Sequence, residues 1–381
     1  MKAKSLIVAL LALGGLHSIN VQAALPTTYE FTFLETLGGP TEPFSINNAS
    51  QIVGYSYTDL QATTSLPVLW ENNTITNLSV PGARYGRGFG INNSGQIAGA
   101  MALPGEFTSY AVVWNNKTPT LLDHLNEGGN SQAWGINDSG QVVGWSSLPD
   151  PDTLEAPVIW NGTTPTQLPT LGIPEGEARA INNSGQITGA SNLGPSTNEP
   201  NFHAMLWQGN TITDLGVLPG GSYSIGLSIN EAGHVVGMSS FDDTGMEHGV
   251  LWADGVMTDL GTLGSAGNFS SAWDINNLGQ IVGYSQTGPG QVVATIWDEG
   301  QLYDLNSFLD ASTAKAGWVL TGALSINDLG QIVGFGYNSS MRLQGGFLLT
   351  PTPIPEPETY AMLMAGLGVL GFVKRRRKAA S

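Results

Sequence analysis

The sequence contains no cysteine, and its central part has very few positive charges. Without cysteine no disulfide can form, so packing and hydrogen bonds must hold an exported chain of this composition together. Of the 30 acidic residues 28 lie between residues 24 and 353, but only six of the 13 basic residues do, which gives this part a net charge of −22. Such a surface repels phosphate backbones, so we expect no nucleic-acid binding. The six basic residues are Arg84, Arg87, Lys117, Arg179, Lys315 and Arg342.

Long apolar runs are also missing, and the run nearest the N-terminus spans only residues 6–16. Eleven residues are too few to cross a bilayer as a helix. Lys2 and Lys4 precede the run, and the small-residue site Val21-Gln22-Ala23 follows it. This order is typical of a secretory signal peptide, so we predict that residues 1–23 are removed after Ala23, with Ala24 as the alternative.

The C-terminus carries a second apolar segment between a proline-rich stretch and a basic cluster. Residues 351–358 form the predicted linker and end in Pro-Glu-Pro-Glu, residues 359–373 are apolar, and residues 374–381 form a basic tail. Fifteen residues are short for a transmembrane helix, but flanking Lys and Arg side chains can reach the interface. Basic residues after the segment favour a cytoplasmic tail. We therefore predict an anchor that leaves the rest of the chain outside the inner membrane.

This order of Pro-Glu-Pro, short apolar segment and arginine cluster resembles the PEP-CTERM sorting signal of Gram-negative bacteria. The resemblance implies processing by an exosortase, a membrane peptidase that removes the tail, in bacteria that make exopolysaccharide. After transient anchoring, the protein would reach the cell surface or the extracellular space. The sorting residues would be Pro355, Glu356, Pro357, Arg375, Arg376 and Arg377. A plain C-terminal membrane anchor on a proline-rich stalk is the alternative.

One phrase, I-N-x-x-G-Q-I-V-G, recurs seven times with little variation. The copies begin at Ile46, Ile91, Ile136, Ile181, Ile229, Ile275 and Ile326, at spacings of 45, 45, 45, 48, 46 and 51 residues. A period in the forties is typical of four-stranded propeller blades. In each unit we expect a first strand that ends in Ile-Asn and an N-x-x-G hairpin turn in which residues such as Gly95 adopt positive φ. A second strand follows, then a third that ends in Trp and a fourth with a T-x-L pattern.

The ends of the repeat region predict how the ring closes. The seventh copy is followed by a third strand, with Phe347 near the usual Trp position, but by no fourth strand. Residues 29–38 form a strand-like segment that has no other blade to join. An N-terminal strand completing the last blade would leave no open sheet edge. We therefore predict an all-β, seven-bladed β-propeller over residues 24–350, narrowed at its axis by the small residue before most of the Ile residues. The alternative is an open β-solenoid.

The repeat phrase and a later segment resemble the HAF repeat of extracellular bacterial proteins. The nearest match is the segment 202–207, Phe-His-Ala-Met-Leu-Trp, in which Met205 replaces the phenylalanine of the family. Most other copies lack the His-Ala pair. The resemblance implies an extracellular location and a repeat fold, and it implies no particular activity.

Motifs for catalysis or metal binding are weak. The four histidines of the repeat region show no ligand spacing, and we interpret them as structural. The N-x-x-G turns lack the alternating carboxylates of calcium loops, so we expect neither a cofactor nor a metal site, with a calcium-stabilised ring as a weaker possibility. No residue stands out as catalytic. Residues repeated seven times serve architecture, whereas catalysis needs one asymmetric cluster.

These observations favour a monomeric, non-catalytic surface or matrix module that binds exopolysaccharide or another surface protein. Six tryptophans occupy the repeated third-strand position, where we expect burial between blades. The candidate ligand-binding residues are the tryptophans outside it: Trp134, Trp145, Trp273 and Trp318. The alternative is an extracellular hydrolase acting on glycans or phosphoesters at the propeller axis. Asp274, the only charged residue directly before a repeated Ile, would be its first candidate residue.

Overall fold

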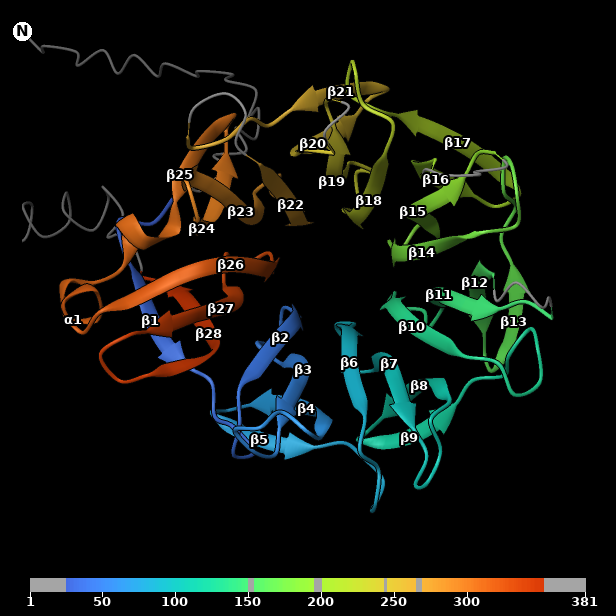
Figure 1. Ribbon diagram of the computed structural model, residues 1–381, viewed down its shortest axis with the longest axis horizontal. Coiled ribbons are helices and arrows are strands. Elements are labelled where there is room, and N and C mark those ends of the chain that lie inside the picture. The colour runs from blue at the N-terminus through green and yellow to red at the C-terminus, as the bar shows by residue number, and fades with distance from the viewer. Residues whose placement is uncertain (1–24, 150–153, 195–200, 243–244, 265–268, 353–381) are drawn as a thin grey trace, which may run out of the picture.

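Seven four-stranded antiparallel sheets surround a central axis in the computed structural model, which describes residues 25–149, 154–194, 201–242, 245–264 and 269–352 (Figure 1). Within these ranges helix is limited to the 3-10 turn η1 (Leu305–Phe308) and the short α1 (Ala311–Lys315), both between blades 6 and 7. The predicted seven-bladed β-propeller is therefore confirmed, and the alternative of an open solenoid is wrong.

The blades are numbered in chain order, and the strands of each blade are given from the innermost, at the axis, to the outermost. Blade 1 consists of β2 (Thr41–Ile46), β3 (Ile52–Tyr57), β4 (Ser65–Glu71) and β5 (Thr74–Asn77). Blade 2 consists of β6 (Gly86–Ile91), β7 (Ile97–Ala102), β8 (Ser109–Asn115) and β9 (Thr118–Leu121). Blade 3 consists of β10 (Ser131–Ile136), β11 (Val142–Ser147), β12 (Glu155–Asn161) and β13 (Thr164–Gln167). Blade 4 consists of β14 (Gly176–Ile181), β15 (Gln186–Asn192), β16 (Phe202–Gln208) and β17 (Thr211–Gly216). Blade 5 consists of β18 (Ser224–Ile229), β19 (Val235–Ser240), β20 (Glu247–Ala253) and β21 (Val256–Asp259). Blade 6 consists of β22 (Ser270–Ile275), β23 (Ile281–Gly288), β24 (Gln291–Asp298) and β25 (Gln301–Asp304).

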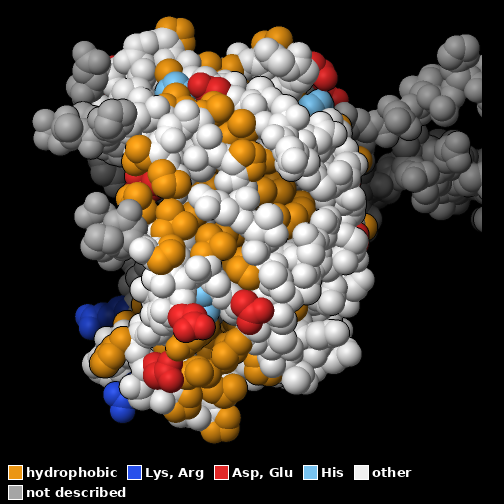
Figure 2. Space-filling model, turned by 90° about the vertical axis from the view of Figure 1, so that its right-hand side faces the viewer, with side chains coloured by type: hydrophobic (Ala, Val, Ile, Leu, Met, Phe, Trp, Pro, Cys, Tyr) orange, Lys and Arg blue, Asp and Glu red, His pale blue; other side chains and the backbone are white. Residues whose placement is uncertain are grey.

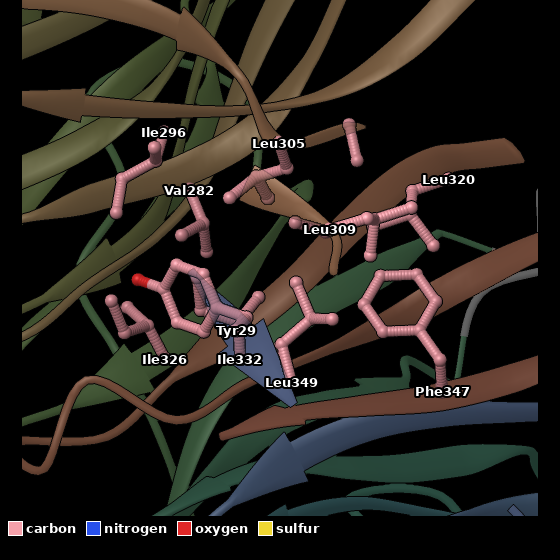
Figure 3. Packing of buried hydrophobic residues seen from close by; sticks show 12 residues of the cluster. Tyr29, Val282, Ile296, Leu305, Leu309, Leu320, Ile326, Ile332, Phe347 and Leu349 are labelled. Carbon is pink, nitrogen blue, oxygen red and sulfur yellow. The ribbon is translucent and has the colours of Figure 1, made fainter. Parts of the chain in front are cut away.

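Blade 7 closes the ring with strands from both ends of the repeat region. It consists of β26 (Trp318–Ile326), β27 (Ile332–Asn338), β28 (Leu343–Pro351) and, outermost, β1 (Tyr29–Phe33). Figure 3 shows the Tyr29 side chain of β1 among apolar residues of blades 6 and 7, where it is 1% exposed. The predicted N-terminal closure is therefore confirmed. Leu349, which pairs with Ile332, takes the usual Trp position; Phe347 lies two residues earlier.

The repeated Asn explains why the phrase recurs. The Asn92 side-chain oxygen accepts hydrogen bonds from the backbone N–H groups of Ser94 (3.1 Å) and Gln96 (2.9 Å), which fixes the turn. Its amide nitrogen donates to the Gln96 side chain and to the carbonyl oxygen of Asn137 in the next blade, both at 2.9 Å. The inter-blade bond recurs seven times and closes from Asn327 back to Asn47 at 3.0 Å. The ring is thus tied together at every blade interface.

The next residue of each turn forms a second ring of hydrogen bonds. The backbone N–H of Asn93 donates to the Asp138 carboxylate at 2.8 Å, and the equivalent bond from Asp328 to the Asn48 side chain closes this ring at 2.9 Å. We call the side of the molecule that carries these turns the turn face. The opposite side, where the chain enters each innermost strand, is the loop face.

The six repeated tryptophans lock neighbouring blades farther from the axis. Each is at most 5% exposed, and its indole N–H donates to a backbone carbonyl at the end of the fourth strand of the preceding blade or within two residues after it. Trp114, for example, donates to Leu78 at 2.8 Å. Trp70 donates to Glu35, directly beyond β1, so the same bond joins blade 1 to blade 7 across the closure. The predicted burial of these tryptophans between blades is confirmed.

Candidate functional site

Every innermost strand has a β-bulge two residues before its repeated Ile. In β10 the register shifts between Ala133 and Gly135, so Trp134 has no partner in the ladder. A bulge bends the strand and re-aims the unpaired side chain. All seven residues at this position line one axial cavity of about 460 Å³, a volume typical of small-molecule sites. They are Phe44, Phe89, Trp134, Arg179, Leu227, Trp273 and Leu324.

The residue between this position and the Ile is small in six of the seven copies, Asp274 being the exception, because the blades converge there. A side-chain carbon at Gly90 would lie 2.7 Å from the carbonyl oxygen of Trp134, and one at Gly135 would lie 3.1 Å from the Cα atom of Ala180. Both distances are shorter than ordinary van der Waals contact. The predicted narrowing at the axis is therefore seen directly.

Aromatic rings form a continuous row along the blade 1 to blade 3 side of the cavity. Phe44 and Phe89 lie 5.3 Å apart between ring centroids, and Phe89 and Trp134 lie 6.2 Å apart. The row continues from Phe44 to Tyr55 (5.7 Å) and from Tyr55 to Tyr57 (5.3 Å). The two tyrosines also line a second cavity of about 310 Å³ between blades 1 and 7. The row thus connects two hollows.

One of the two cavity arginines is neutralised within the protein. The Arg179 guanidinium lies 3.4 Å from the ring centroid of Trp134 and forms an ion pair with Glu177 at 2.6 Å. Burial raises the pKa of the Glu177 carboxyl, and Arg179 acts in the opposite direction. Gln132 accepts a hydrogen bond from the Trp134 indole at 3.0 Å. These contacts fix the orientation of Trp134.

The second arginine of the cavity, Arg87, has a different environment. Its guanidinium lies over the rings of Tyr55 (4.7 Å to the centroid) and Tyr85 (5.6 Å). Within the described part of the chain it forms no ion pair, and its Nε atom is buried without a hydrogen-bond partner. Glu42, the nearby acid, instead accepts a hydrogen bond from the Tyr55 hydroxyl at 2.7 Å. Unlike Arg179, Arg87 therefore has no carboxylate partner among the described residues.

Asp274 lines the cavity, but both of its carboxylate oxygens are occupied. One accepts hydrogen bonds from the Ser228 hydroxyl (2.6 Å) and the Ile275 N–H (2.9 Å). The other accepts from the Ser325 hydroxyl (2.7 Å) and the Ile326 N–H (2.9 Å), both in blade 7. Burial raises the pKa of Asp274, while these hydrogen bonds act in the opposite direction. The side chain joins three neighbouring blades.

The four tryptophans that the sequence singles out lie in different places. Trp134 and Trp273 line the axial cavity. Trp145 lies on the second strand of blade 3 and is only 7% exposed. Trp318 begins β26 and packs against Phe31 (4.9 Å) and Phe33 (5.1 Å) of β1, at the outer strand of blade 7. The structure therefore brings together only the first two.

Sequence reasoning also singled out Asp274 at the axis, but it missed the other five residues at the bulged position. A large side chain two residues before each repeated Ile was a visible signal in Phe44, Phe89, Arg179, Leu227 and Leu324. The residue type at this position differs from copy to copy, however, and the repeat is recognised from the residues that stay the same.

Two of the histidines form matching pairs away from the axis. His203 lies 2.9 Å from the Asp214 carboxylate, and His248 lies 2.8 Å from Asp259, each pair joining the third and fourth strands of its blade. Across the described ranges, no group of three His, Cys, Asp or Glu residues is placed to hold a metal ion.

The predicted targeting segments lie outside the described residues. This applies to the signal peptide 1–23, the sorting residues 355–357 and 375–377, and the apolar segment 359–373. Within the ranges that are described, every helix is too short or too polar to span a membrane.

The C-terminal resemblance is supported by a family model. The model of the PEP-CTERM protein-sorting motif matches residues 353–378, so the chain carries this sorting motif. The motif indicates an exported protein that is processed by exosortase. A comparison with curated proteins gave no match.

Solved structures support the fold alone, because sequence identity is low. The chain is similar to the β-propeller domain of the Trilobed protease from Pyrococcus furiosus, described as having an open velcro topology, with 11% identity, a TM-score of 0.54, and coverage of 86% of this chain and 100% of that one. YCF48 bound to D1 peptide matches with 11% identity, a TM-score of 0.52, and coverage of 87% and 99%. The acylaminoacyl peptidase of Pyrococcus horikoshii matches with 11% identity and a TM-score of 0.53; 85% of this chain spans about half (54%) of that one.

Proposed function

We propose that the protein is a cell-surface or matrix module that binds a glycan of the exopolysaccharide in its axial cavity, without catalysing a reaction. We also propose that its repeats are of the HAF type and that it acts as a monomer. The observation that carries the binding proposal is the ring of bulged side chains, three of which are Phe44, Phe89 and Trp273. A sugar ring has an apolar C–H face that can stack on an aromatic side chain, and its hydroxyls need a few polar groups.

The loop face supports this proposal because it can enlarge the contact surface. The fully described connections from the second to the third strand, and from one blade to the next, lie on this face; examples are residues 103–108, 122–130 and 217–223. Binding residues are often presented on loops that a rigid scaffold holds in place. On the turn face, by contrast, short turns are engaged in the two inter-blade rings.

The non-catalytic reading is supported by Asp274, the residue first considered for catalysis. Its oxygens already accept four hydrogen bonds from Ser228, Ile275, Ser325 and Ile326, so it has a structural task in the ring. We expect no release of reducing ends when the protein is incubated with the exopolysaccharide. Hydrolysis that is lost in a folded Asp274→Ser variant would favour the hydrolase instead.

Binding is tested with the full chain and exopolysaccharide from the source organism in a co-sedimentation assay. Trp273→Ala removes one aromatic face from the cavity and should weaken binding about tenfold or more, as for a well-packed contact residue. Leu329→Ala is the control, because this apolar residue is 59% exposed on a turn of the opposite face, away from the cavity loops. Equal affinity of Trp273→Ala and the wild type would contradict binding in the axial cavity.

A further inference from the structure

The distribution of charge sets the axial cavity apart from the rest of the surface. Two of the six basic residues between positions 24 and 353, Arg87 and Arg179, line it. On the side of the molecule in Figure 2, acidic side chains occur at several places, whereas Lys and Arg appear only along one edge. An anionic ligand is therefore repelled over most of the surface. The cavity offers it positive charge beside a single lining carboxylate, Asp274, whose two oxygens already accept hydrogen bonds within the ring.

Arg87 supplies that charge because Arg179 is paired with Glu177 at 2.6 Å. The Arg87 guanidinium lies over two tyrosine rings, and its buried Nε has no hydrogen-bond acceptor, which is unfavourable for a polar group. Because Arg87 lines the cavity and has no carboxylate partner among the described residues, a ligand carboxylate in the cavity would pair with its guanidinium. The guanidinium presents parallel donors that match a carboxylate, and the pair is frequently bidentate.

The neighbouring side chains indicate what carries the carboxylate. Phe44 and Phe89 lie in the row that borders Arg87, and both line the same cavity. A ring with an apolar face and a carboxylate at its edge would contact the aromatic row and the guanidinium together. This combination is the chemistry of a uronic acid residue. An acidic peptide side chain also has a carboxylate, but it has no flat face for the aromatic rings.

We propose that the axial cavity binds a uronic acid residue of an acidic polysaccharide, with its carboxylate paired to Arg87 and its ring against Phe44 and Phe89. This inference rests on the proposed glycan-binding function and names its substrate class.

The test uses the full chain with two polymers that share a backbone and differ in charge, polygalacturonate and its methyl ester. Alginate serves as a second uronate polymer. We expect both uronates to bind, the methyl ester to bind at least tenfold more weakly, and Arg87→Gln to lose about 10- to 100-fold in affinity for the acidic forms, the usual range for a hydrogen-bonded ion pair. Arg87→Lys keeps the positive charge but not the planar pair of N–H donors, so it should lose less affinity than Arg87→Gln.

The control is Lys117→Gln, which removes one positive charge from an exposed turn on the opposite face and should bind within twofold of the wild type. The thermal midpoint of Arg87→Gln is measured alongside to confirm that it folds. If Arg87→Gln binds like the wild type, or if the methyl ester binds as tightly as the acid, the uronate inference is wrong while the glycan-binding function stands. If polyglutamate binds and both uronates do not, the occupant is an acidic peptide. If no polysaccharide binds, neutral or acidic, both proposals fail.

Discussion

Replacing Asn92 by alanine measures what the inner hydrogen-bond ring contributes to stability. Asn92 is 4% exposed and makes four hydrogen bonds, three within its own turn and one to Asn137 of the next blade. At about 0.5–1.5 kcal/mol for each bond, the loss lies between about 2 and 6 kcal/mol. We expect the lower part of this range, about 2–3 kcal/mol, because the partners in the turn are near the surface and can rebind water.

Urea unfolding followed by tryptophan fluorescence gives the free energy by linear extrapolation. At about 2 °C per kcal/mol for a domain of this size, the thermal midpoint should fall by about 4–6 °C. Asn93→Ala is the matched control: it is the adjacent asparagine, it is exposed, and its side chain accepts only from Asn48 and donates to Asp138 at 3.3 Å. It should lose less than about 1 kcal/mol.

Asn327→Ala extends the test to the closure between blades 7 and 1. Asn327 makes the same four bonds as Asn92, with Asn47 as its inter-blade partner at 3.0 Å. Because the ring is continuous in space, we expect the two variants to lose the same free energy to within about 0.5 kcal/mol, although only one of them lies at the chain closure. Equal effects of Asn92→Ala and Asn93→Ala would refute the argument, because burial and inter-blade bonding would then have no measurable value.

Three further predictions concern other parts of the ring. Asp274→Ala should lower the thermal midpoint more than Asp274→Ser, because a serine hydroxyl can bond the next blade as Ser325 bonds the Ile46 N–H at 3.3 Å; equal midpoints would argue against this bridging role. Tyr29→Ala should lower the free energy of unfolding in urea by about 3–5 kcal/mol, because it leaves a cavity at a fully buried site of the closure. A decrease of less than about 1 kcal/mol would mean that β1 contributes little to stability. Burial, with Glu177 and Glu247 nearby, raises the pKa of Tyr223 from 10.0 to about 12, so the folded state favours the neutral phenol. This contribution to the free energy of unfolding is fully present below pH 10 and is lost as the pH rises toward about 12. Tyr223→Phe has no phenol to ionise, so between these pH values its free energy of unfolding should fall less than that of the wild type. Identical pH profiles of the two proteins would exclude the effect.

The blade number and the closure could be predicted from sequence because the repeated residues each make a defined contact within or between blades. Asn92 and its six equivalents hold both their own turn and the next blade, so no other residue type replaces them. Trp114 and its equivalents must reach a carbonyl of the preceding blade. Strand 29–33 could be assigned to blade 7 because no other blade lacked a fourth strand.

The cavity lining was harder to predict because the bulge interrupts the alternation of side chains along the innermost strand. Strand patterns assign side chains to alternating faces, and an unpaired residue breaks this rule. Trp134 and Trp145 therefore looked equivalent as tryptophans outside the repeated position, although the first lines the cavity and the second is buried within the blade. The isolation of Arg87 depends on which acids reach it in space, and spacing along the chain does not contain that information.

The same bulge explains how one scaffold can keep its ring and still carry an individual site. A side chain at the bulged position has no ladder partner and points to the axis, so its replacement leaves the Asn and Trp bonds between blades intact. Seven repeats can therefore present Phe, Trp, Leu and Arg at this one position while the turn residues stay nearly constant. Binding and stability should separate accordingly: Phe89→Ala should change ligand affinity with little effect on unfolding, and Asn92→Ala should do the reverse. A large loss of stability in Phe89→Ala would show that the cavity lining is part of the core.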